Sequence, residues 1–119
     1  MGDGFMASFT SASGALDAAI AMQQSISAHF DTTSTPVRIR VGVNAGEPIE
    51  EDDDLYGTAV IQAARVMGLA DGGQILVTDT VRNLVAGKPY LFSDHGSHDL
   101  KGFEELARLF QVGWADREE

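Results

Sequence analysis

The centre of this 119-residue chain reads Glu51-Asp-Asp-Asp-Leu-Tyr-Gly-Thr-Ala-Val-Ile-Gln-Ala-Ala-Arg65. Its first part belongs to a run of carboxylates, residues 50–54, which is typical of a solvated loop. Its second part predicts a helix, because small and apolar residues recur with a period of about 3.6. The residues of this stripe are Ala59, Val60, Ala63, Val66, Met67 and Ala70. Ile61 and Arg65 share a different face, so Arg65 points away from the core. On spacing alone, a solvated surface arginine explains this position most simply.

Strands and helices alternate on both sides of this segment. The patterns upstream predict a strand at Phe5–Thr10, a helix from Ala12 to Phe30 with Ser11 as its N-cap, and a strand at Val37–Val43. The patterns downstream predict strands at 74–78, 90–93 and 107–112 and a helix near 80–86. Alternating elements with hairpins predict an α+β domain.

Composition excludes several classes of function. The net charge is −10, with only eight lysines and arginines, which disfavours nucleic acid and anionic membranes as partners. Cysteine is absent, so disulfides and thiolate zinc sites are excluded. No stretch has the length of a membrane span, and the first residues lack the features of a signal peptide. We therefore expect a cytoplasmic protein without membrane contact from this segment.

Five collinear segments resemble the class III nucleotide cyclases, the adenylate and guanylate cyclase catalytic domains. The central one is Asp54-Leu-Tyr-Gly-Thr-Ala-Val-x-x-Ala-Ala-Arg65. The others are Gly2-Asp-Gly-Phe-Met-Ala-Ser-Phe9, Val37-Arg-Ile-Arg-Val-Gly-Val-Asn-Ala-Gly46, Gly73-Gln-Ile-Leu-Val-Thr78 and Leu100-Lys-Gly-Phe103. The resemblance covers residues 1–113, followed by a tail at 114–119. It corresponds to the C-terminal two thirds of a family domain, so the first strands and helices of that fold are expected to be missing. It implies a ferredoxin-like antiparallel sheet with helices packed on one side.

The resemblance also implies a reaction and roles for individual residues. ATP would be converted to 3′,5′-cyclic AMP and pyrophosphate by two Mg²⁺ or Mn²⁺ ions at a homodimer interface. Arg65 matches the arginine that stabilises charge on the transferring phosphoryl group, and Arg40 and Lys101 match phosphate-contacting residues. Asp54 matches an aspartate that accepts a hydrogen bond from the adenine amino group, which favours ATP over GTP. Asp3 matches one of two metal-binding carboxylates, although a turn-forming aspartate is an alternative interpretation.

Two departures from the family pattern keep a second function open. Ile61 occupies the position of the asparagine that orients the ribose, and an alkyl group makes no hydrogen bond. Gln62 lies about 100° around the helix, so it is not a simple replacement. The second metal carboxylate has no counterpart, so the chain alone is expected to be inactive. The alternative is a non-catalytic cyclase-like domain that dimerises or senses nucleotides.

Two further expectations concern a histidine pair and assembly. His95 and His98 lie three residues apart in a predicted loop, Asp94–Gly102. They are compatible with part of a metal site, although two imidazoles without further donors are more often surface residues. The missing first strand would lie between the strands at 5–10 and 37–43. An unpaired edge there predicts a strand-exchanged oligomer or the homodimer of the family.

Overall fold

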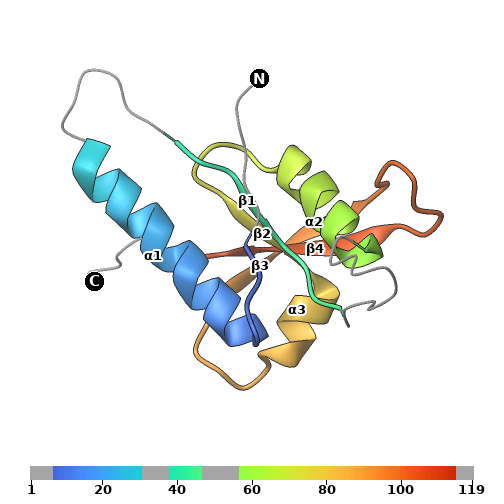
Figure 1. The fold of residues 1–119 in the computed structure, drawn as a ribbon, viewed down its shortest axis with the longest axis horizontal. Coiled ribbons are helices and arrows are strands. Elements are labelled where there is room, and N and C mark those ends of the chain that lie inside the picture. The colour runs from blue at the N-terminus through green and yellow to red at the C-terminus, as the bar shows by residue number, and fades with distance from the viewer. Residues whose placement is uncertain (1–6, 31–37, 47–56, 115–119) are drawn as a thin grey trace.

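The computed structural model describes residues 7–30, 38–46 and 57–114 (Figure 1). Two predicted site residues, Asp3 and Asp54, lie outside these ranges. The helices are α1 (Ala12–Phe30), α2 (Thr58–Leu69) and α3 (Asp79–Leu84), and the strands are β1 (Val41–Val43), β2 (Ile75–Thr78), β3 (Phe92–His98) and β4 (Ala107–Val112). Within the described ranges, no helix combines the length and apolar character needed to cross a membrane.

The strands form one sheet in the order β1-β2-β4-β3. The β2–β4 and β4–β3 pairs are antiparallel, whereas β1 and β2 run parallel, with Val41 opposite Ile75. The parallel pair follows from the position of α2 between these strands in the sequence, because a crossover helix returns the chain to the end at which β1 began. The predicted α+β fold is confirmed, and this parallel pair is its one departure from an antiparallel sheet among the described strands.

Helices cover both faces of the sheet. Ile75 and Val77 of β2 pack with α1 and α3, whereas Leu76 packs with Val66 of α2. Successive strand residues point to opposite faces, so α2 lies on the side opposite α1 (Figure 1). The expectation of helices on one side only is therefore wrong. All four residues of β2 are buried, as a central strand covered on both faces requires.

Helix α1 has the predicted bounds. The Ser11 hydroxyl accepts a hydrogen bond from the Gly14 amide at 3.0 Å, which confirms Ser11 as the N-cap. Leu16 is fully buried on the inner face. Gln23, 2% exposed, donates its amide to the carbonyls of Ile39 and Gln74 at 3.1 and 3.2 Å. The helix is thereby fixed to the segments that enter β1 and β2.

The strand predicted at Phe5–Thr10 is not formed over its described part, residues 7–10. A strand needs a hydrogen-bonded neighbour, and none of the described strands pairs with these residues. Val41–Val43 is the regular part of the predicted 37–43 strand, although the Ile39 carbonyl still accepts a hydrogen bond from the Gly73 amide at 2.7 Å.

Strand β3 continues five residues into the predicted loop, to His98 rather than ending near Ser93. The pairing with β4 shifts register between Asp94 and Gly96, so His95 is the extra residue of a β-bulge. Gly96 adopts a φ of +88°, a left-handed conformation that glycine tolerates. The glycine that suggested a loop therefore allows the strand to continue.

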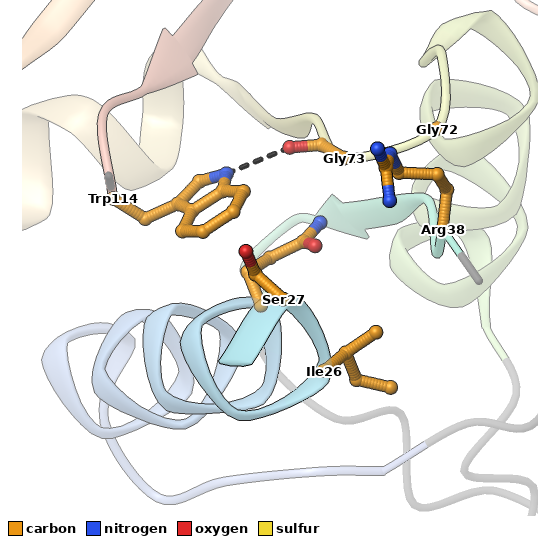
Figure 2. Close-up of a pocket in the computed structure, with 7 residues that line it drawn as sticks. Ile26, Ser27, Arg38, Gly72, Gly73 and Trp114 are labelled. Atoms are coloured by element: carbon orange, nitrogen blue, oxygen red, sulfur yellow. Dashed lines mark hydrogen bonds between the residues drawn. The ribbon is translucent and has the colours of Figure 1, made fainter. Parts of the chain in front are cut away.

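Trp114 packs against the core at the end of the described chain. Its indole Nε1 donates to the Gly73 carbonyl at 2.7 Å, and its own carbonyl accepts a hydrogen bond from Gln24 at 3.0 Å. Figure 2 shows the indole between α1 and the turn before β2, at the rim of a cavity of about 300 Å³. The packed part of the domain thus reaches residue 114.

Candidate functional site

The position of α2 depends on a glycine in β1. A Cβ atom added at Gly42 would lie 2.5 Å from the Met67 amide nitrogen and 2.6 Å from the Ala63 carbonyl oxygen. Only glycine allows the helix backbone to approach the strand this closely. Met67, predicted as a core residue, is 37% exposed, because its backbone rather than its side chain faces β1.

Asn44 fixes the first turns of α2 to two strands. Its Nδ2 donates to the Ala59 carbonyl at 3.1 Å and to the Gln62 Oε1 at 2.9 Å. Its Oδ1 accepts a hydrogen bond from the hydroxyl of Thr78, 2% exposed, at 2.7 Å. Sequence reasoning missed this residue, although a polar side chain at the end of an apolar strand was a signal. Because Gln62 bonds to Asn44, it is engaged away from the Ile61 face.

Arg65 and Lys101, predicted from separate segments, lie in direct contact. The Arg65 Nε donates to the Lys101 carbonyl at 3.2 Å, and both residues are exposed. The loop that carries Lys101 is held from below, because Leu100 is 2% exposed and packs in one cluster with Val66 of α2. The two residues predicted to contact phosphates thus lie side by side on one surface.

Ile61 lies one turn before Arg65 and is 48% exposed. Its exposure confirms that this face of α2 is distinct from the core stripe. Val66 and Ala70 of that stripe are buried, at 0% and 3% exposure. The face beside Arg65 therefore presents a branched alkyl group, which makes no hydrogen bond.

Arg40 is exposed just before β1. Within the described ranges, no hydrogen bond or ion pair joins it to Arg65 or Lys101. That Arg40 acts at the site of a partner protomer stays a prediction.

The predicted pair of metal ions cannot be placed on the described residues. Asp3, its predicted ligand, falls outside the described ranges, and the described residues hold no group of three or more histidines, aspartates and glutamates suited to a metal ion. The predicted magnesium site therefore lies outside the described residues and stays a prediction.

A groove of about 810 Å³ lies between the first turns of α2, the start of α3 and the loop after β3. Its lining includes the carboxylates Asp79, Glu104 and Glu105. The basic residue in it, Arg108, is paired with Asp94 at 2.6 Å. Arg108 hydrogen bonds hold the pKa of Asp94 below its usual value. This acidic lining disfavours a triphosphate in the groove.

Comparison with known proteins identifies the class of domain. A family model described as the adenylate and guanylate cyclase catalytic domain matches residues 1–112, and the chain belongs to this family. A protein of Rhizobium meliloti named "Putative adenylate cyclase 3" is 36% identical over 98% of this chain. The chain spans only 20% of that relative's length.

Solved structures agree with the fold. The adenylate/guanylate cyclase/hydrolase from Silicibacter pomeroyi superposes with a TM-score of 0.77 and 31% identity, over 87% of this chain and 63% of that one. The adenylyl cyclase CyaB from P. aeruginosa gives a TM-score of 0.73 at 24% identity, over 89% of this chain and 60% of that one, and supports the fold alone. The predicted cyclase family and fold are confirmed.

Proposed function

We propose that this chain is the phosphate- and base-binding part of an adenylate cyclase domain, which converts ATP to 3′,5′-cyclic AMP and pyrophosphate. One observation carries the proposal: the Arg65 side chain donates to the Lys101 backbone carbonyl at 3.2 Å, so two residues that match phosphate-contacting positions of the family come from distant segments to one surface. A guanidinium and an ammonium together suit a polyphosphate.

The reaction assigns a task to each residue. The ribose 3′-hydroxyl loses its proton to solvent and its oxygen forms a bond to the α-phosphorus, while the bond from that phosphorus to the oxygen bridging to the β-phosphate breaks. Pyrophosphate leaves with the electron pair of that bond. Arg65 would stabilise the charge that develops on the transferring phosphoryl group, and Lys101 would hold the departing phosphates. Arg40 would contact phosphate in the partner protomer's site, which makes a homodimer part of the mechanism.

Base selection rests on Asp54. A carboxylate accepts a hydrogen bond from the adenine amino group, whereas guanine presents a carbonyl at that position and is repelled. We therefore propose ATP as the preferred substrate over GTP. The two metals of the family would depend on Asp3 together with a carboxylate that has no match in this sequence. Acting alone, the chain would be inactive.

Ile61 favours a second candidate, a cyclase-like domain that binds nucleotide or dimerises without turnover. Its half-exposed alkyl side chain lies one turn from Arg65 and offers no hydrogen bond to a ribose. The phosphate and base contacts do not depend on this position, so nucleotide binding would persist in such a domain while positioning of the 3′-oxygen would be lost.

Nucleotide binding to the purified chain tests the phosphate site. We expect ATP to bind, and Arg65→Ala and Lys101→Ala each to weaken binding by about tenfold, because each removes a charge-assisted contact. Lys88→Ala is the matched control, since it removes one exposed positive charge from the turn after α3. If Lys88→Ala and Lys101→Ala weakened ATP binding equally, the loss would come from net charge alone, which would contradict a specific phosphate site.

Light scattering at micromolar concentration tests assembly. We expect a dimer or a strand-exchanged oligomer, because β1 is an edge strand of the described sheet. A well-folded monomer at that concentration would contradict this part of the proposal.

A further inference from the structure

Strand β3 carries two imidazoles in contact with each other at the bulge. The His95 Nδ1 lies 3.2 Å from the His98 Nε2, and the rings stack with centroids 5.1 Å apart. The same His98 Nε2 lies 2.7 Å from the His95 backbone carbonyl oxygen. The His98 Nε2 therefore lies within contact distance of two electron-pair donor atoms of His95.

The spacing of the two nitrogens fits a chelate. A first-row divalent metal holds each imidazole nitrogen at about 2.0–2.1 Å. Two such nitrogens lie roughly 2.9–3.4 Å apart when the angle at the metal is between a right angle and the tetrahedral value. The observed 3.2 Å falls in this range, so the imidazoles need little rearrangement to bind one ion.

The fold holds this pair in place. His95 is the extra residue of the bulge, and Gly96 with its φ of +88° lets the chain turn there. His98 pairs with Ala107 across the β3–β4 ladder, which fixes its backbone. Both side chains are half-buried, and β3 is an outer strand of the described sheet. The site is thus rigid on the protein side and open to water on the other.

We propose that His95 and His98 form a binding site for a divalent transition metal of the Ni²⁺, Cu²⁺ and Zn²⁺ group. Two imidazoles and one carbonyl oxygen are a nitrogen-rich set that suits these ions, with water completing the coordination. Mg²⁺ prefers oxygen ligands and competes poorly here. The site involves none of the residues assigned to nucleotide binding, so it is separate from the proposed reaction.

The alternative is a simple hydrogen bond between the rings, in which one nitrogen donates and the other accepts. Titration of the tag-free chain with NiCl₂ in excess Mg²⁺ distinguishes a metal site from a simple hydrogen bond. We expect one Ni²⁺ per chain, with His95→Ala and His98→Ala each weakening binding by about tenfold or more. Loss of a residue that only hydrogen-bonds to a metal ligand already lowers metal affinity by about tenfold, and loss of a ligand itself should cost at least as much. His29→Ala, which removes the third histidine of the chain, is the matched control and leaves binding unchanged.

A second measurement needs no variant. Substoichiometric Cu²⁺ broadens the amide NMR signals of nearby residues, and we expect residues 95–98 to broaden first in the wild-type chain. Absence of Ni²⁺ binding overturns the proposal. So does binding that survives both histidine substitutions in folded variants, or broadening centred elsewhere.

Discussion

Replacement of Gly42 by alanine tests how α2 is positioned on the sheet. The new Cβ would lie 2.5 Å from the Met67 nitrogen, 2.6 Å from the Ala63 oxygen and 2.8 Å from the Met67 Cα. All three are backbone atoms, so no side-chain rotation relieves the clash and the whole helix must move. Overpacking of a core costs about 1–3 kcal/mol, and we expect the upper end of this range.

Thermal unfolding followed by circular dichroism measures this cost. A loss of about 3 kcal/mol lowers the Tm by roughly 10–20 °C in a domain of this size. Gly68→Ala is the matched control. Gly68 lies on the same helix, α2, and nothing lies within 4 Å of a Cβ added there. Alanine there stabilises the helix by up to about 1 kcal/mol. A Gly42→Ala protein as stable as wild type would refute the close strand–helix contact.

Two further substitutions test the polar contacts. Asn44→Ala leaves the buried Thr78 hydroxyl without its acceptor and should lower the free energy of unfolding by about 1–3 kcal/mol. The matched control, Asn83→Ala at an exposed position, should lower it by under about 0.5 kcal/mol. Urea unfolding measures both. Burial, followed by the hydrogen bond to Asp17 at 2.7 Å, raises the pKa of Tyr90 from 10.0 to about 12. Because the folded-state pKa is raised, this contribution to stability is complete below pH 10 and is lost as the pH rises towards 12. Tyr90→Phe should abolish that alkaline loss, and an unchanged pH dependence would contradict it.

Local signals in the sequence predicted local structure well. The Ser11 cap and the spacing of Leu16, Ala19 and Gln23 suffice to fix α1, because capping and periodicity act within a few residues. The bulge in β3 was missed for a related reason. Gly96 has a positive φ, which occurs in both turns and bulges, so only the pairing with β4 distinguishes them.

Long-range features needed the family resemblance or the coordinates. Arg65 and Lys101 are 36 residues apart, and nothing in their local sequence indicates that they meet. Their contact depends on Leu100 packing with Val66 beneath the loop. Gly42 had the one available signal, a glycine within a strand, which marks a close backbone approach without saying what approaches.

The central claim is that Arg65 belongs to the catalytic surface of an adenylate cyclase. Its most direct test is formation of cyclic AMP from ATP by a cyclase in which residues 1–112 replace the matched segment of the Silicibacter pomeroyi protein, which is 31% identical and superposes with a TM-score of 0.77. We predict that this graft turns over ATP. Arg65→Ala should lower its turnover by about 100- to 1,000-fold, because it removes charge stabilisation in the transition state. Ile61→Asn should raise the turnover, and Lys88→Ala should leave it unchanged. A folded graft that binds ATP yet makes no cyclic AMP, even with Ile61→Asn, would contradict the enzyme and favour the nucleotide-binding module.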